Sequence, residues 1–225
     1  MAPRTPRLPE AQGIQRCPSM SSTKRGATRE ASDYYVTPQW AILDFLSAFV
    51  TDNPAIIFEP LTILDPCAGG DSARPMAYPQ ALATFGRLDI ERLITLDIRD
   101  DSPASQKGDY LQTVLSATPN LIITNPPFGL TIPIIEKALA DVSGGGWVIM
   151  LQRLNFFGGQ HEKREFFDRV GPPSFCYVHR RRCGFMPAGS INPASGKPYT
   201  QDSIEYAHFV WVEGARPQWT RLRII

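Results

Sequence analysis

Short apolar runs separated by amphipathic stretches fill the sequence from Tyr34 onward, and this alternation restricts the chain to few folds. A run that is apolar at every position predicts a strand buried on both faces, as in the centre of a parallel sheet. Helices that cross between parallel strands would account for the amphipathic stretches. The pattern therefore predicts an α/β fold wound around a parallel sheet, with strands at residues 61–64, 93–96, 121–124 and 146–151.

Amphipathic stretches around these runs predict helices at residues 38–50, 132–140 and 162–170. Thr37 followed by Pro38 is typical of an N-cap and a first helical residue. Two later runs, 174–179 and 204–212, resemble strands joined by a long loop rich in Gly, Pro and Arg. A β-hairpin is the simplest interpretation of this pair.

The size and composition fit one globular domain. The chain has 225 residues, of which 43% are hydrophobic and 20% are charged, which is enough for one continuous core. No apolar run approaches the roughly 20 residues that a membrane-spanning helix needs, and the N-terminus lacks a secretory apolar stretch. We therefore expect a soluble intracellular protein that contacts no membrane.

The cysteines are too scattered for a zinc or redox site. None of Cys17, Cys67, Cys176 and Cys183 belongs to a Cys-x-x-Cys pair. His179 lies between the last two, but three side chains do not complete a four-ligand zinc site. We expect reduced thiols and no bound metal.

Charge is unevenly distributed, although the net charge is only +1. Residues 1–30 carry six basic and two acidic side chains and few large apolar ones, so a disordered basic tail is expected there. Residues 31–125 carry five basic against twelve acidic side chains, and residues 126–225 carry twelve basic against eight acidic. An acidic part followed by a basic part suits a protein that binds a cationic cofactor and a polyanion.

The sequence Thr124-Asn125-Pro126-Pro127-Phe128 ends one of the apolar runs, where an open parallel sheet presents ligand-contacting groups. The prolines fix the backbone, so the Asn125 side-chain oxygen and the Pro126 carbonyl are expected to form a rigid pair of acceptors beside the Phe128 ring. Such a pair suits an exocyclic amine, because acceptors on both hydrogens favour a tetrahedral nitrogen that attacks a methyl donor directly. The alternative is that Pro-Pro only ends a strand and that Phe128 belongs to the core.

A loop of small residues, Asp65-Pro66-Cys67-Ala68-Gly69-Gly70-Asp71, follows the first apolar run. It has neither the glycine spacing of dinucleotide sites nor the Gly-Lys-Ser/Thr of phosphate loops, which argues against hydride transfer and nucleotide hydrolysis. Asp65 suits a cation such as the α-amino group of a methionine moiety. Asp97 could accept two ribose hydroxyls and Asp109 an adenine amino group, although a lone Asp there is more often a cap or turn residue.

Together these motifs resemble the amino-group class of DNA methyltransferases. Residues 33–38 resemble its N-terminal cofactor motif, 65–70 its glycine motif, Asp97 and Asp109 its acidic positions, and 125–128 its catalytic motif. The motif order is similar to that of many adenine-specific enzymes, including small solitary ones of the phage type. The resemblance covers residues 33 to about 212. It implies a Rossmann-like class I methyltransferase fold, a seven-stranded and mostly parallel sheet with an antiparallel C-terminal hairpin, and S-adenosylmethionine as cofactor.

The resemblance also implies the site residues and the domain limits. Catalysis and contacts to the target base are expected from Asn125, Pro126, Pro127 and Phe128. Residues 1–31 form the tail, and residues 32–225 the methyltransferase domain with a small recognition region at about 152–203. Cofactor contacts are expected from Tyr35, Thr37, Pro38, Asp65, Pro66, Cys67, Ala68, Gly69, Asp97, Ile98, Asp109, Tyr110 and Asn125.

The choice of DNA depends on the C-terminal half. A base inside a duplex must be flipped out to be methylated, so the enzyme must hold the flanking phosphates. Residues 152–200 carry eight basic against three acidic side chains, and Phe156, Phe157 and Phe185 are candidates to wedge between bases. We expect a site-specific adenine-N6 methyltransferase, a monomer or weak dimer in a bacterial or phage-infected cell. DNA contacts are expected from Arg153, Arg180, Arg181, Arg182 and Lys197.

Several alternatives stay open. Enzymes that methylate amino groups of RNA or glutamine side chains of proteins share the catalytic motif, and a non-catalytic DNA-binding module could keep the fold. The basic residues could belong to a solvated charged hairpin, and the stretch 72–75 makes the loop after the glycine motif longer than is usual in the family. Methylation of cytosine C5 is rejected, because an enzyme of that class needs a nucleophilic Cys that follows a Pro near the fourth strand. In this chain the Pro-Cys pair, Pro66-Cys67, lies in the cofactor loop instead.

Overall fold

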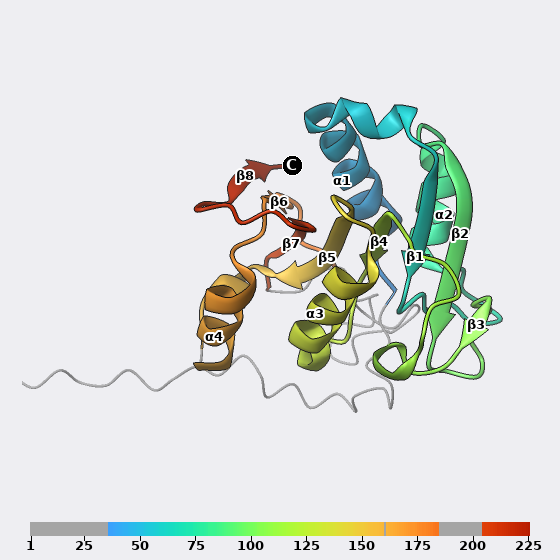
Figure 1. The fold of residues 1–225 in the computed structure, drawn as a ribbon. Helices are drawn as coiled ribbons and strands as arrows, with labels where there is room; N and C mark the ends of the chain where they lie inside the picture. Colours follow the sequence, from blue (N-terminus) through green and yellow to red (C-terminus); the bar gives the residue numbers. More distant parts are fainter. Residues whose placement is uncertain (1–35, 160, 185–203) are drawn as a thin grey trace, which may run out of the picture. The chain divides into compact units, whose positions relative to one another are not determined.

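The computed structural model describes residues 36–159, 161–184 and 204–225, so the predicted tail, Tyr35, Phe185 and Lys197 lie outside the described residues. In the described part, helices cover both faces of one sheet (Figure 1). The helices are α1 (Gln39–Asp52), α2 (Ala77–Phe85), α3 (Thr131–Asp141) and α4 (His161–Val170), with 3-10 turns η1 (Pro54–Phe58), η2 (Tyr110–Gln112), η3 (Phe128–Leu130) and η4 (Leu154–Phe157). The strands are β1 (Leu61–Asp65), β2 (Ile90–Asp97), β3 (Gln106–Lys107), β4 (Leu121–Thr124), β5 (Trp147–Arg153), β6 (Phe175–Val178), β7 (Tyr206–Val212) and β8 (Arg221–Ile224).

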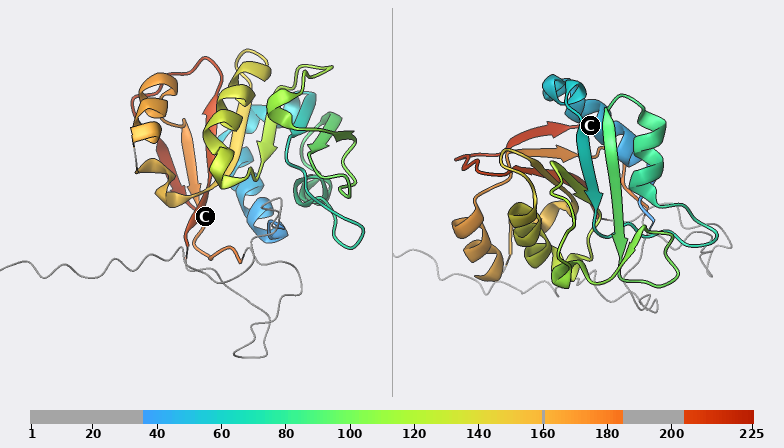
Figure 2. Two further views of the ribbon diagram at one scale, coloured as in Figure 1. Left: turned by 90° about the horizontal axis from the view of Figure 1, so that it is seen from below. Right: turned by 45° about the vertical axis from the view of Figure 1, so that its right-hand side comes forward.

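Alternate side chains of the central strands build two separate cores. In β4, Ile122 packs with the helices of one face, whereas Leu121 and Ile123 pack with those of the other. This alternation follows from the two-residue period of a strand. Helices α3 and α4 cover the first core and α1 and α2 the second, as the two views of Figure 2 show. Because both faces are buried, every residue of β4 must be apolar or small.

The strand order places a site at one edge of the sheet. The order is β3-β2-β1-β4-β5-β7-β6-β8, with β1 parallel to both β2 and β4. The chain therefore winds outward in opposite directions from β1 and β4, which makes a crevice at their carboxyl ends, where ligands bind in open α/β sheets. Strand β7 is antiparallel to β5 and to β6, so β6 runs in the direction of β5 and ends at the same edge.

The structure confirms the predicted fold class and adds elements that the sequence pattern did not show. The sheet has eight strands among the described residues rather than the expected seven, because β8 adds to β6 in parallel. Helix α2 and the short strand β3 were also not predicted. The expectation that Thr37 caps the first helix is wrong: α1 begins at Gln39, its N-cap is Pro38, and no side chain caps it.

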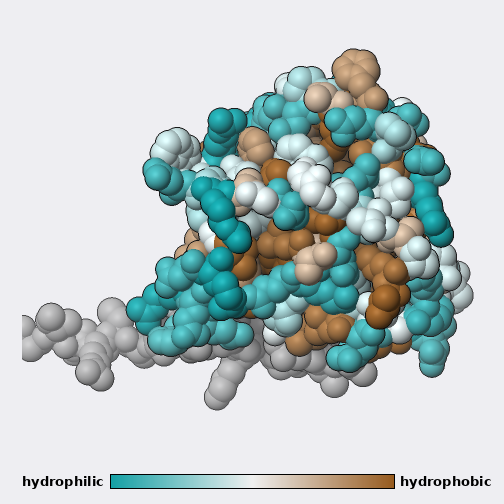
Figure 3. Space-filling model, viewed as in Figure 1, coloured by the Kyte–Doolittle hydropathy of each residue, from teal (hydrophilic) through white to brown (hydrophobic). Residues whose placement is uncertain are grey.

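Much of the face shown in Figure 3 is hydrophilic, and apolar side chains are visible in a hollow near its middle. The wedge expected from Phe156 is not available, because its ring is only 4% exposed and packs against Phe166, Phe209 and Trp211. Phe157 is 39% exposed. In the part of the chain that the structure covers, no helix is long and apolar enough to cross a membrane.

Candidate active site

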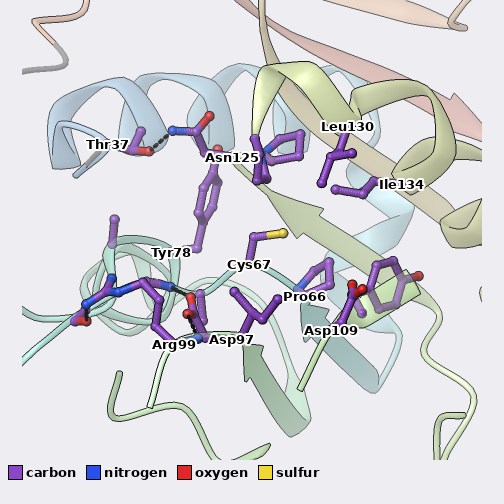
Figure 4. A pocket seen from close by; sticks show the side chains of 18 of the residues that line it. Thr37, Pro66, Cys67, Tyr78, Asp97, Arg99, Asp109, Asn125, Leu130 and Ile134 are labelled. Carbon is purple, nitrogen blue, oxygen red and sulfur yellow. Dashed lines mark hydrogen bonds between the residues drawn. The ribbon is translucent and has the colours of Figure 1, made fainter. Parts of the chain in front are cut away.

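A cavity lies at the carboxyl ends of β1, β2 and β4 (Figure 4). Its walls come from the glycine loop after β1, the turn after β2 and the segment after β4, which the strand order brings together at the crevice. In Figure 4, Thr37 and Asn125 lie on one side of the cavity, and Asp97 and Arg99 lie on the other. Residues that were far apart in the sequence motifs therefore share one site.

The glycine loop, residues 65–71, is held against the end of β2 by hydrogen bonds that its backbone amides donate. The Ala68 amide donates to the Leu96 carbonyl at 3.0 Å, and the Gly69 amide donates to Asp97 Oδ2 at 2.6 Å. Gly69 and Gly70 adopt φ values of 64° and 77°, a region that favours glycine. The loop thus follows a tight path along the end of β2, and its backbone lines the cavity.

Asp97 organises the opposite wall. Its Oδ2 accepts from Gly69, its Oδ1 accepts from the Arg99 amide at 2.8 Å, and the residue is 6% exposed. Arg99, which was not predicted for the site, donates from Nη2 to the Gly70 carbonyl at 3.1 Å and forms an ion pair with Asp101. Each Asp97 oxygen retains a further lone pair for a ligand hydroxyl.

Asp65 lies beneath the cavity rather than on its wall. Its Oδ1 accepts from the Thr124 hydroxyl at 2.7 Å and from the Cys67 amide at 3.3 Å, and its side chain is fully buried. Its Oδ2 has no hydrogen-bond partner in the described part of the chain. Burial raises the pKa of this carboxyl to about 7. An orphaned buried oxygen of this kind favours a positive group nearby.

Asn125 is anchored by one atom of its amide only. Its Nδ2 donates to the Thr37 hydroxyl at 3.1 Å, as Figure 4 shows. Its Oδ1 is buried and has no partner among the described residues. Since the nitrogen is engaged by Thr37, the amide is oriented and its oxygen is left as an acceptor for a donor from outside the chain.

Phe128 stands between this cavity and a second hollow, since it lines both. The guanidinium carbon of Arg153 lies 4.9 Å from the centroid of the Phe128 ring, and the Tyr206 ring lies at 5.9 Å. Phe128 belongs to the turn η3, is half-buried and packs against a small buried cluster that includes Leu151 and Tyr206.

Tyr78 is a cavity residue that the sequence analysis missed because it belongs to the unpredicted helix α2. Its hydroxyl lies 3.0 Å from His208 Nε2, and His208 Nδ1 lies 2.9 Å from His179 Nε2. Burial lowers the pKa of His179 to about 4 and holds the pKa of His208 well below its ordinary value. Both imidazoles are therefore neutral at pH 7, and the chain of bonds fixes the Tyr78 side chain through neutral groups.

Most residues that were predicted to contact the cofactor line the cavity. Pro38 and Asp65 do not, and Tyr35 lies outside the described residues. Asp109 lies on the wall with Oδ1 accepting from the Leu111 amide at 3.0 Å, and Ile98 is 63% exposed. The predicted residues on the wall are Thr37, Pro66, Cys67, Ala68, Gly69, Asp97, Ile98, Asp109, Tyr110, Asn125, Pro126, Pro127 and Phe128.

The described basic residues predicted for DNA contacts follow strands that end at the cavity edge of the sheet. Arg153 ends β5, and Arg180, Arg181 and Arg182 follow β6, which runs in the same direction. Arg180 is exposed, the Arg181 guanidinium lies 4.6 Å from the Trp40 ring, and Arg182 forms an ion pair with Glu205 at 3.1 Å.

The cysteines in the described part are Cys67, Cys176 and Cys183. Burial and the neighbouring carboxylates hold the pKa of the Cys67 thiol well above its ordinary value, so Cys67 is a poor nucleophile. Within residues 36–159, 161–184 and 204–225, no group of three or more His, Cys, Asp or Glu side chains is placed to hold a metal ion.

Solved structures with a similar fold identify the architecture. A protein from Listeria monocytogenes, assigned to the class I S-adenosylmethionine-dependent methyltransferases, superposes with a TM-score of 0.56 at 14% identity and matches 84% of this chain. The fold is that of the class I methyltransferases. No protein-family model and no curated protein sequence matches the chain.

The class I fold of this chain also resembles two structures from restriction systems. The type IIG restriction endonuclease BpuSI gives a TM-score of 0.53 at 13% identity over 82% of this chain. A modification subunit assigned to a type I restriction enzyme of Vibrio vulnificus gives 0.54 at 10% identity over 85%. The chain spans 65%, 26% and 47% of the lengths of the Listeria, BpuSI and Vibrio chains, respectively.

Proposed function

We propose that this chain is an S-adenosylmethionine-dependent methyltransferase that acts on the N6 amino group of adenine in DNA. The observation that carries the proposal is the buried and unpartnered Oδ1 of Asn125, a residue of the cavity wall whose Nδ2 is bound to Thr37. An acceptor that lacks a donor, placed in an Asn-Pro-Pro-Phe segment after a central strand, suits a substrate that brings an amino group.

The cavity residues fit S-adenosylmethionine as the cofactor. A Cβ atom at Gly70 would lie 2.9 Å from Met76 Cγ, so the loop keeps its tight path only without a side chain there. The orphaned Asp65 Oδ2 and the Asp97 carboxylate make this part of the site acidic, as a cationic ligand requires. When bound, S-adenosylmethionine supplies a methyl group on a positively charged sulfur. Asp97 would hold the ribose hydroxyls and Asp109 the adenine amino group, while Asp65 would favour the positive methionine end from beneath the loop.

Further cofactor contacts are proposed from Thr37, Pro66, Cys67, Ala68, Gly69, Ile98 and Tyr110. The chain's own residues then act on the target amine. Asn125 Oδ1 and the Pro126 carbonyl accept its two hydrogens, which favours a tetrahedral nitrogen with its lone pair directed at the methyl group. Phe128 stacks on the base, and Leu130 and Ile134 add apolar surface to the cavity wall. Amide oxygens are too weakly basic to keep a proton, so the proton of the methylated amine leaves to solvent.

DNA is the substrate that the surroundings of the cavity favour. Arg153 and the run Arg180 to Arg182 lie at the same edge of the sheet as the cavity, where they can hold the phosphates beside a flipped base. The similarity in fold to the restriction endonuclease BpuSI and to the modification subunit from Vibrio vulnificus is in keeping with this choice. We expect the protein to act as a monomer or weak dimer.

The test is methyl transfer from labelled S-adenosylmethionine to duplex DNA, to RNA and to a glutamine-bearing protein, assayed in parallel. We expect incorporation into DNA alone, and single-molecule sequencing of DNA from a methylation-deficient host that expresses the protein should show N6-methyladenine in one sequence context. Label in RNA or protein instead would overturn the choice of DNA, and no label in any substrate would overturn the proposed activity.

A further inference from the structure

A second hollow adjoins the cavity on the other side of Phe128. It lies between the start of α3, the carboxyl end of β5 and the start of α4, which Figure 1 shows on the same face of the sheet. Its volume of about 220 Å³ is several times the roughly 30 Å³ of a water molecule, so a phosphate group fits inside. Of its polar groups, the function proposed above uses only Arg153.

Two neighbouring residues that line this hollow, Gln152 and Arg153, carry unpaired donors. Gln152 is 2% exposed, and its Nε2 is buried with no hydrogen-bond partner among the described residues. The Nε of Arg153, the next residue, is also buried and unpartnered there. A buried donor without a partner costs free energy, so such atoms are rare in native proteins and indicate a missing ligand or water. Two such donors on adjacent residues of one hollow favour an occupant that brings acceptors.

The charge of the hollow indicates that the acceptor is anionic. Within the described residues the Arg153 side chain makes no ion pair or hydrogen bond, and its guanidinium lies on the Phe128 ring. Lys163 donates to the carbonyls of Asn155 and Gly158 at 3.3 and 3.2 Å, and burial together with the Arg153 charge lowers its pKa. Glu162, the acidic residue that lines the hollow, is exposed. Among the described residues, neither Arg153 nor Lys163 forms an ion pair with a carboxylate, although the charge of Glu162 acts on Lys163.

We infer that this hollow binds a backbone phosphate of the strand that carries the target base. The phosphate oxygens would accept from Arg153 Nε and Gln152 Nε2, and Lys163 would add positive charge. Phe128 would then separate a base on its cavity side from a phosphate on its other side, so that one turn fixes both parts of one nucleotide. The inference rests on the proposed function, because it takes DNA as the ligand, and it adds Gln152 and Lys163 to the residues that position the substrate.

The first test compares Arg153→Gln with Arg87→Gln in binding to a fluorescein-labelled duplex oligonucleotide, followed by anisotropy over a range of salt concentrations. Arg87 is a matched control, because its guanidinium also lies on a phenylalanine ring, Phe85, at 5.6 Å, but it precedes β2 at the opposite edge of the sheet. We expect Arg153→Gln to weaken binding about tenfold and to reduce the slope of log K against log salt by about 1, as the loss of one phosphate contact does. Arg87→Gln should change neither.

The second test uses Gln152→Met, which keeps the side-chain length but removes the amide. A role in holding the fold would make this variant less stable in urea, whereas a donor reserved for a ligand makes it at least as stable as the wild type. We expect unchanged or higher stability with DNA binding about 5- to 10-fold weaker. Equal DNA binding by the wild type, Arg153→Gln and Gln152→Met would overturn the phosphate site and leave the proposed function standing. A wild type that binds S-adenosylmethionine but no duplex would overturn the choice of DNA, and this inference with it.

Discussion

The Thr37 hydroxyl accepts a hydrogen bond from Asn125 Nδ2 at 3.1 Å, although the two residues are 88 positions apart in the sequence. Thr37 precedes α1 and Asn125 follows β4, so the bond ties the segment before the first helix to the end of a central strand. With Nδ2 bound to Thr37, the Oδ1 of Asn125 is the atom left free, whereas an amide turned by half a revolution would leave a donor instead of an acceptor for the substrate.

Replacing Thr37 by Val removes this orientation with little change in volume. We expect Thr37→Val to lower kcat about tenfold, since losing one such hydrogen bond costs about 1 to 2 kcal/mol, and to change the affinity for S-adenosylmethionine much less. Thr37→Ser keeps the hydroxyl and should retain most of the activity. Steady-state kinetics beside calorimetric titration of the cofactor would measure both quantities. The orienting role is wrong if the Val and Ser variants have equal kcat.

Asp65 should make the protein less stable as the pH rises. The pKa of this carboxyl is about 7 in the fold and about 4 in an unfolded chain, so the folded state binds the proton more tightly between these values. Stability from Asp65 is then fully present below about pH 4 and is lost as the pH rises to about 7. We expect the wild type to lose about 2 to 3 kcal/mol more than Asp65→Asn between about pH 5 and pH 8 in urea unfolding. Parallel pH profiles of the two proteins would contradict the raised pKa.

Gly70 should tolerate no side chain. Gly70 and Gly214 have φ values of 77° and 76°, but a Cβ at Gly70 would meet Met76 and Pro103 at 2.9 and 3.0 Å, whereas a Cβ at Gly214 meets nothing within 4 Å. Gly214→Ala should therefore cost about 1 kcal/mol of unfolding free energy for the backbone conformation alone, and Gly70→Ala about 1 to 3 kcal/mol more. Chemical denaturation compares them directly. Equal losses in the two variants would show that the loop can shift away from Met76.

The sequence predicted the central sheet well, because buried parallel strands are apolar at every position and carry their own signal. The strands around Ile63, Ile94, Ile122 and Ile149 all form where the apolar runs stand. Helix α2 was not predicted, and Pro75 and Pro79 weaken its local signal, although a proline in the first turn of a helix removes no needed hydrogen bond. Strand β8 is exposed at each position and exists only by pairing with β6, which no local pattern reveals.

The candidate site was predicted at the level of motifs but not of atoms. The segments after β1, β2 and β4 meet because parallel strands end at one edge, and this follows from the fold class. Three features of the site depend on side-chain contacts between distant segments. They are the bond of Asn125 to Thr37, the position of Asp65 beneath the glycine loop and the position of Tyr78 on the cavity wall. Such contacts leave no periodic trace in the sequence. Arg99 was within reach of prediction, since it stands two residues after Asp97 in the same turn.

The most direct test of the central claim, that Asn125 Oδ1 receives the target amine, is methyl transfer to DNA and S-adenosylmethionine binding measured on one preparation of Asn125→Ala. Asn120→Ala is the matched control, because Asn120 stands just before β4, at the end of the strand away from the cavity, where its amide bonds Thr62 and Pro60. We predict that Asn125→Ala lowers transfer by roughly 10²- to 10³-fold, as loss of one preorganised hydrogen-bonding group does. Its affinity for the cofactor should be nearly unchanged, and Asn120→Ala should be fully active. Transfer that persists in Asn125→Ala, or transfer and cofactor binding lost together, would contradict the account.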